Sequence, residues 1–89
     1  MDMKTLIDIA AKHGKQTQAQ LAKEMGKAPA RISDWKNGHW KPDAGEILYL
    51  ADKAGLPAIK TLVEIQGQID DRYANLWKKA VSELRQNQG

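Results

Sequence analysis

Residues 18 to 37 read QAQLAKEMGKAPARISDWKN and contain two short helical patterns separated by about three residues. Two helices that cross near a right angle need small residues at their closest approach, and the turn between them needs a backbone that tolerates positive φ. Ala22 and Gly26 stand at those places. The apolar positions expected to lock the helices together are Leu21, Met25, Ile32 and Trp35. The stretch therefore predicts a rigid pair of helices, the second within residues 28 to 37.

Helix-capping signals on both sides of this pair predict further helices. Thr17 and Gln20 have the spacing of a capping box, and Asp43 and Glu46 form a similar pair. Gly14 is expected to end a first helix in the left-handed conformation. No segment alternates apolar and polar residues with the period of two that strands show. The fold is therefore predicted to be all-α, a bundle of about five helices with an extra C-terminal helix.

Proline and glycine mark the remaining helix boundaries. Pro29 and Pro57 suit the first position of a helix, because proline fixes φ and lacks the N–H that is unpaired there. Gly67 is expected to break or soften the chain before a last helical segment. The chain is thus divided into a helix-turn-helix domain, residues 1–66, and a C-terminal helical extension, residues 67–89. The extension carries an apolar stripe of the core or dimer type at Ile69, Tyr73, Leu76, Trp77, Ala80, Val81 and Leu84.

Composition is typical of one small globular domain without disulfides. The chain has 89 residues, of which 42% are hydrophobic and 28% are charged, and it contains no cysteine. No segment has the apolar length of a signal peptide or approaches the roughly 20 apolar residues of a membrane-spanning helix. We therefore expect a cytoplasmic protein without a membrane partner.

Charge is distributed unevenly along the chain. Residues 1 to 42 hold eight basic and four acidic residues, a net charge of +4. The remainder holds six basic and seven acidic residues, a net charge of −1. This asymmetry predicts that the first half of the chain faces a polyanion.

The helical pair, its ending ISDWKNG and the KPD that follows resemble the Cro/repressor type of helix-turn-helix. This is the lambda-repressor-like fold (XRE family) of phage repressors and bacterial regulators, and the resemblance covers roughly residues 4 to 66. It implies a small phage or prophage regulator that binds double-stranded operator DNA and places a recognition helix, residues 28 to 37, in the major groove. It also implies a transcriptional repressor of the bacterial cell that is associated with the nucleoid when bound.

The same resemblance assigns roles to individual residues. Gln18, the first residue of the first helix of the pair, is expected to contact a DNA phosphate. Asn37 and the loop after it are expected to contact the DNA backbone on the other side. The positions that match the family's base-facing residues are Ala28, Pro29, Ala30, Ser33 and Asp34. The full set of expected DNA-binding residues is Gln18, Lys27, Ala28, Pro29, Ala30, Arg31, Ser33, Asp34, Lys36, Asn37, His39 and Lys41.

Helical geometry independently supports this arrangement. Consecutive residues of a helix lie 100° apart, so Ile32 and Trp35 point to one side. The opposite arc is made by Ala30, Ser33, Asp34 and Asn37. Arg31 and Lys36 flank that arc, where phosphates would lie, and Lys15, Lys27 and Lys41 are further expected phosphate contacts.

The expected base-reading arc departs from the usual chemistry, because it holds no glutamine or arginine for bidentate contacts with adenine or guanine. The remaining base contacts are short-range. Pro29 and Ala30 can touch thymine methyl groups, Ser33 can bond either type of base, and Asp34 can accept from cytosine N4. We therefore expect modest sequence specificity or a contribution from DNA shape.

Several residues of this region have simpler interpretations. Asp34 is expected to pair with Arg31 one turn earlier, and Trp35 is expected to lie in the core. Trp40 lies in a loop, where it either caps the core or lies against DNA or a partner. The two histidines are isolated and have no metal-ligand spacing, so no zinc site is expected.

No catalytic site is expected from this sequence. It shows no paired carboxylates in a plausible pocket, no histidine beside a nucleophile and no glycine-rich phosphate loop. We expect no enzyme activity, no cofactor and no small-molecule substrate. A homodimer formed through the C-terminal helix is expected, and the alternative function is an antitoxin or a protein-interaction module built on the same fold.

Overall fold

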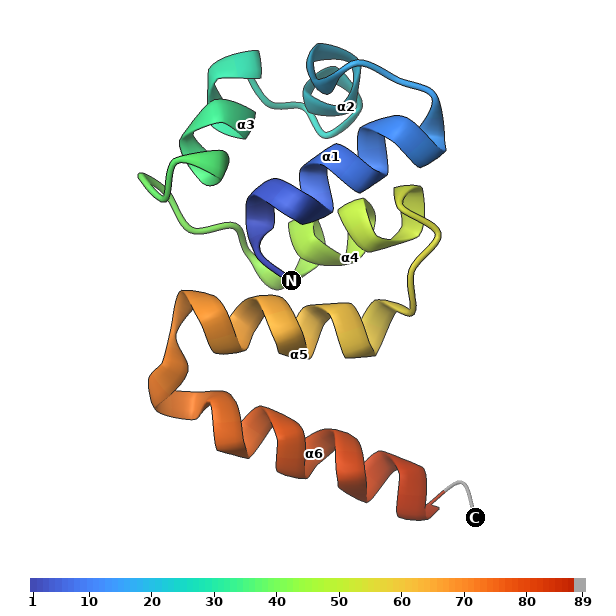
Figure 1. Ribbon diagram of the computed structural model, residues 1–89, viewed down its shortest axis with the longest axis vertical. Coiled ribbons are helices and arrows are strands. Elements are labelled where there is room, and N and C mark those ends of the chain that lie inside the picture. The colour runs from blue at the N-terminus through green and yellow to red at the C-terminus, as the bar shows by residue number, and fades with distance from the viewer. Residues whose placement is uncertain (88–89) are drawn as a thin grey trace.

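Every regular element between residues 1 and 87 is helical in the computed structural model, which describes those residues and the side chains of residues 1–83 (Figure 1). The elements are α1 (Met3–Gly14), α2 (Gln18–Glu24), α3 (Pro29–Lys36), α4 (Ala44–Lys53), α5 (Ala58–Ile69), a short 3-10 turn η1 (Asp71–Tyr73) and α6 (Ala74–Asn87). The all-α prediction, with an extra helix at the C-terminus, is confirmed.

One hydrophobic core joins α1 to α5. Its fully buried large side chains are Leu6, Ile7, Leu21, Ile32, Ile47, Leu50 and Ile65. These residues come from all five helices, so each helix contributes an apolar side to a common centre. Truncation of one such side chain to alanine typically costs about 2–5 kcal/mol, which is a large part of the stability of so small a domain.

Two capping boxes fix the starts of α2 and α4. The N–H of Gln20 donates to Thr17 Oγ1 at 3.1 Å, and the N–H of Thr17 donates to Gln20 Oε1 at 2.8 Å. Asp43 and Glu46 make the same reciprocal pair, with both distances 2.8 Å. Each box satisfies two backbone N–H groups that a helix start would otherwise leave unpaired, so both predicted starts are confirmed.

The end of α1 differs from the sequence-based expectation. Gly14 is still helical, and Lys15 takes the left-handed conformation with φ 54° and ψ 43°. The N–H of Gln16 donates to the carbonyl of Ala11 at 3.0 Å, which closes the helix around Lys15. The expected left-handed Gly14 is therefore wrong by one residue, because the hydrogen bonds that end the helix form one position later.

The C-terminal part of the chain is a helical hairpin of α5 and α6 that lies against the end of the bundle formed by α4 (Figure 1). Helix α5 begins at Ala58, with Pro57 as its cap, and continues through Gly67, so the turn falls at residues 70–73. A Cβ on Gly67 would lie 3.5 Å from the Cβ of Ala74, so the two helices approach closely here. Asp70 holds the turn, because its carboxylate accepts from the Arg72 guanidinium at 2.9 and 2.7 Å.

Candidate nucleic-acid interface

The turn between α2 and α3 has the geometry that its small residues predict. Ala22 is fully buried, and its carbonyl accepts from the N–H of Lys27 at 2.8 Å. Gly26 has a φ of +70°, a region that residues with a side chain rarely adopt. The two helices are thus joined by a short connection at one end of the molecule (Figure 1).

Helix α3 turns one side to the core and the other to solvent. Ile32 is 1% exposed and Trp35 is 3% exposed, which confirms that Trp35 is a core residue. On the opposite arc, Ala30, Ser33 and Asn37 are exposed, whereas Asp34 is half-buried. The side that helical geometry predicts to face outward is therefore open at three of its four predicted positions.

Both ends of α3 are defined by backbone geometry. Pro29 occupies the first turn, as predicted, and Ala28 precedes it as a cap without a side-chain hydrogen bond. At the other end Gly38 has a φ of +76°, and the N–H of His39 donates to the carbonyl of Asp34 at 2.9 Å. These bonds fix the direction in which the loop of residues 37–42 leaves the helix.

Acidic residues neutralise part of the basic charge around α3. Lys27 Nζ lies 3.4 Å from Glu46 Oε2. Asp8 of α1 receives two of the expected phosphate contacts on one oxygen: Gln18 Nε2 donates to Asp8 Oδ1 at 3.3 Å, and Lys36 Nζ lies 3.4 Å from the same atom. Asp8 was not among the residues selected from the sequence, because its partners lie 10 and 28 positions away.

Arg31 and Asp34 do not form the expected ion pair with each other. The Arg31 guanidinium carbon lies 4.8 Å from the centroid of the Trp40 ring, and Asp34 Oδ1 lies 3.9 Å from His39 Nδ1. The expected Arg31–Asp34 pair is therefore wrong, because the loop after α3 folds back and supplies a partner to each residue. Trp40 lies over Arg31 and is 57% exposed, so it does not close the core.

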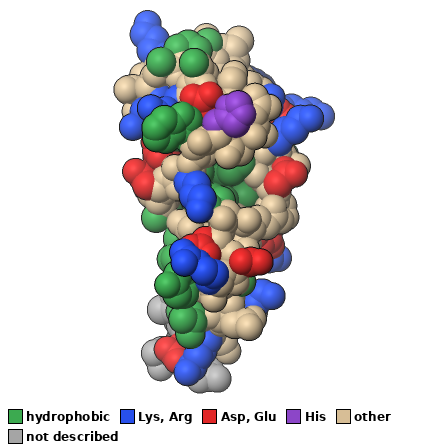
Figure 2. All heavy atoms as spheres, turned by 90° about the vertical axis from the view of Figure 1, so that its left-hand side faces the viewer, with side chains coloured by type: hydrophobic (Ala, Val, Ile, Leu, Met, Phe, Trp, Pro, Cys, Tyr) green, Lys and Arg blue, Asp and Glu red, His purple; other side chains and the backbone are tan. Residues whose placement is uncertain are grey.

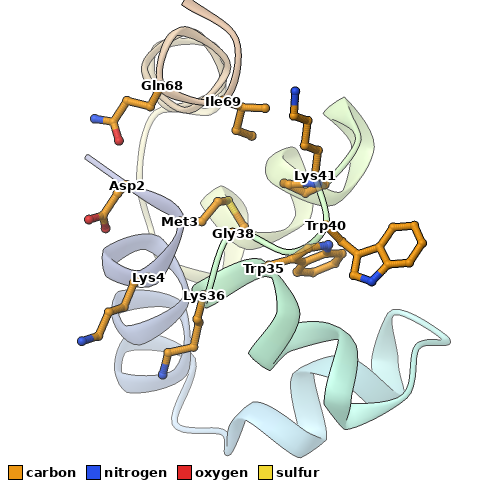
Figure 3. Close-up of a pocket in the computed structure, with 11 residues that line it drawn as sticks. Asp2, Met3, Lys4, Trp35, Lys36, Gly38, Trp40, Lys41, Gln68 and Ile69 are labelled. Atoms are coloured by element: carbon orange, nitrogen blue, oxygen red, sulfur yellow. The ribbon is translucent and has the colours of Figure 1, made fainter.

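A hollow of about 320 Å³ lies beside this loop, between the start of α1 and the end of α5 (Figure 3). Figure 3 shows Trp40 projecting from the loop away from α1, and Lys41 extending toward the end of α5 that carries Ile69. The Arg72 guanidinium holds the pKa of the Asp70 carboxyl at about 2, with a smaller contribution from the charge of Lys41. The charge of Lys41 therefore favours the ionised form of the Asp70 carboxyl at the turn between α5 and α6.

The surface around α3 and the turn before α6 is mixed in charge. Basic, acidic and apolar side chains alternate on this face, and an apolar strip continues down the C-terminal hairpin (Figure 2). Exposed large apolar side chains in the described part of the chain include Trp40 and, on the hairpin, Ile59, Tyr73 and Leu76.

A polar cluster around Glu24 ties α2 to α4 and was not recognised in the sequence. The Glu24 carboxylate accepts from the Tyr49 hydroxyl and, at 2.6 Å, from Gln16 Nε2, and Lys53 Nζ lies 3.3 Å away. These donors hold the pKa of Glu24 below its usual value. Burial and the neighbouring carboxylate raise the pKa of Tyr49 to about 12. The cluster fixes α2, and through the tight turn also α3, relative to the rest of the bundle.

Comparison with known proteins identifies no relative: no family model matches the chain, and no curated protein or solved structure matches it. Among the side chains of residues 1–83, no group of three or more histidine or carboxylate side chains is placed to hold a metal ion. None of the helices described combines the length and apolar character that a membrane-spanning segment requires.

Proposed function

We propose that this protein is a sequence-specific DNA-binding transcriptional regulator of the Cro/repressor helix-turn-helix type, a small phage or prophage repressor. The observation that carries the proposal is the orientation of α3. Its apolar side chains, Ile32 and Trp35, are buried, while Ala30, Ser33 and Asn37 face outward at the end of the molecule. An exposed helix held rigidly in this way fits the major groove of DNA.

In this proposal the regulator acts only by occupying its operator DNA. It binds operator DNA in the cytoplasm, associates there with the nucleoid, and represses transcription by excluding the polymerase. No catalytic step, cofactor or small-molecule substrate takes part. Base contacts come from short side chains: Ser33 bonds either type of base, and Pro29 and Ala30 pack against thymine methyl groups.

Phosphate contacts supply most of the affinity. The polar or basic residues proposed to contact phosphates are Gln18, Lys27, Arg31, Lys36, Asn37, His39 and Lys41. Each phosphate neutralised by a lysine or arginine contributes about −0.9 to the slope of log affinity against log salt. Affinity should therefore fall steeply as the salt concentration rises.

A homodimer formed through the C-terminal helix α6 completes the proposal. One shallow apolar groove is bordered by Tyr73 of η1 and by Leu76, Trp77 and Ala80 of α6, and Tyr73 and Leu76 are 50% and 61% exposed. Trp77 and Val81 of the predicted stripe are half-buried, and the side chain of Leu84 lies outside the described residues. A twofold dimer would place two recognition helices about 34–36 Å apart on a palindromic operator.

The test of this function is a charge reversal on the outward face. We expect the double substitution Arg31→Glu with Lys36→Glu to abolish binding to a mixed-sequence duplex at low salt, measured by fluorescence anisotropy. The matched control is Lys60→Glu with Lys78→Glu, which changes the net charge equally on the hairpin. Equal loss of affinity in the two variants would contradict the proposed interface.

The alternative candidate is an antitoxin or a protein-interaction module on the same fold. It is favoured by the carboxylates beside Lys27 and Lys36, and by the absence of glutamine or arginine on the outward arc of α3. A wild-type protein without duplex affinity at low salt, together with capture of a specific protein partner, would support this second function.

A further inference from the structure

We propose that Trp40 is a positioning residue that holds the guanidinium of Arg31 in place for a DNA phosphate. The inference rests on the proposed function and extends it to a residue outside the helix-turn-helix. Its basis is the stacked pair in which the Arg31 guanidinium carbon lies 4.8 Å from the centroid of the Trp40 ring. Arg31 comes from the first half of α3 and Trp40 from the loop that follows the helix, so the loop returns to α3 to make this contact.

Stacking leaves the hydrogen-bonding capacity of Arg31 intact. When the flat face of a guanidinium lies on an aromatic ring, its five N–H groups point outward in its own plane. The edge of Arg31 can therefore bind phosphate oxygens while its face remains on Trp40. A lysine held by a carboxylate lacks this freedom, because the ion pair occupies its charge.

The neighbouring cations show this contrast. Lys27 lies 3.4 Å from a carboxylate oxygen of Glu46, and Lys36 lies 3.4 Å from one of Asp8. In the part of the chain that the structure describes, no carboxylate oxygen lies within 4.0 Å of the Arg31 guanidinium nitrogens. Arg31 thus keeps its full charge for a phosphate, and Trp40 restrains it without neutralising it.

The exposure of Trp40 also fits this role. More than half of the side chain is open to solvent, and the indole projects from the loop away from α1 (Figure 3). Trp35 provides the tryptophan of the core, at 3% exposure. Removal of the Trp40 ring should therefore leave the folded domain in place and free the Arg31 side chain to sample other rotamers, at an entropic cost on binding.

The decisive experiment measures duplex affinity and its salt dependence for substitutions at both positions. The probe is a mixed-sequence DNA duplex titrated between about 50 and 200 mM salt. Trp40→Leu should weaken binding about two- to fivefold and leave the salt slope unchanged, because the charge of Arg31 remains. Trp40→Phe keeps an aromatic face and should restore most of the affinity. Arg31→Met should reduce the magnitude of the slope by about 0.9.

A double-substitution cycle separates positioning from direct contact. If Trp40 acts through Arg31, Trp40→Leu should have no further effect on affinity in the Arg31→Met protein. An equal loss in both backgrounds, or unchanged affinity in Trp40→Leu, would overturn the inference and leave the proposed function standing. A wild-type protein with no duplex affinity would overturn both.

The stack can also be observed without DNA. In the free protein the Nε–Hε proton of Arg31 should resonate upfield of its usual position, because the guanidinium carbon bonded to Nε lies over the Trp40 ring. Trp40→Leu should remove this shift and leave the backbone amide spectrum of α3 intact. An Arg31 resonance at its ordinary position in the wild type would contradict the arrangement itself.

Discussion

Lys36 Nζ lies 3.4 Å from Asp8 Oδ1, so the last turn of α3 is linked to the middle of α1 by an ion pair. The same carboxylate oxygen accepts from Gln18 Nε2 at 3.3 Å. A single anionic oxygen is therefore held by two side chains that the resemblance and the surrounding charge assign to DNA phosphates. Asp8 occupies the position of a competing anion at the edge of the proposed interface.

Replacement of this anion should strengthen binding to DNA. We expect Asp8→Asn to raise duplex affinity about two- to fivefold, since Lys36 no longer exchanges a carboxylate for a phosphate and one repulsive charge is removed. When Asp8→Asn is added to a Lys36→Met protein, the gain in affinity over Lys36→Met alone should be much smaller. Both comparisons are measured by anisotropy at low salt. Unchanged or weaker binding of Asp8→Asn would contradict the competition.

The left-handed residue at the end of α1 gives a prediction of stability. Lys15 has a φ of 54°, which costs a residue with a side chain about 1 kcal/mol relative to glycine. Lys15→Gly should therefore stabilise the protein by about 0.5–1 kcal/mol in urea unfolding without DNA. Lys12→Gly in the last turn of the same helix is the matched control and should destabilise by about 1 kcal/mol. Destabilisation by both substitutions would show that the left-handed cap is not formed.

The sequence predicts local structure well because local interactions set it. The capping boxes at Thr17 and Asp43, and the turn at Gly26, depend on residues within a few positions of one another, and all three lie where expected. The outward arc of α3 follows from the helical period alone. The cap of α1 is displaced by one residue, because Gly14 and Lys15 are adjacent candidates and the final hydrogen bonds choose between them.

Side-chain partners of the candidate site could not be predicted in the same way. Arg31 and Asp34 have the spacing of an ion pair within one helix, but the loop of residues 38–41 returns to α3 and supplies Trp40 and His39. Asp8 meets Lys36 only because the packing of the core brings α1 beside α3. Such contacts depend on tertiary structure, which periodicity and capping signals do not describe.

The carboxylate of Glu24 predicts a particular dependence of stability on pH. Its pKa is lowered in the folded protein, chiefly by the hydrogen bond from Tyr49, so the cluster stabilises the fold above the unfolded pKa of about 4.5. This contribution should be lost as the pH falls through the lower, folded value. Glu24→Gln should lower the melting temperature at neutral pH, and the difference from wild type should shrink toward acid. A difference independent of pH would contradict the ionised cluster.

The apolar side of α6 gives a prediction of oligomeric state. Leu76 is 61% exposed beside Tyr73, and a second copy of the chain is the proposed cover. Leu76→Glu should convert a dimer into a monomer in analytical ultracentrifugation and lower operator affinity at least about tenfold, because two linked half-sites become independent. Ile59→Glu, at an exposed apolar position of α5, is the control and should remain dimeric. A wild-type monomer at high concentration would refute the dimer.

Adjacent positions of α3 should respond in opposite ways, because Ile32 is 1% exposed and Ser33 is exposed on the outward arc. Ile32→Ala should cost about 2–4 kcal/mol of unfolding free energy, and Ile32→Val, at about 1 kcal/mol, serves if the alanine variant does not fold. Ser33→Leu should change stability by less than about 0.5 kcal/mol. It should nevertheless weaken duplex binding about tenfold or more, since the added side chain keeps α3 from closing on the base edges. Denaturant titration and anisotropy on the same samples measure both effects. Loss of stability in Ser33→Leu, or full affinity in that variant, would mean that this side of α3 does not face DNA.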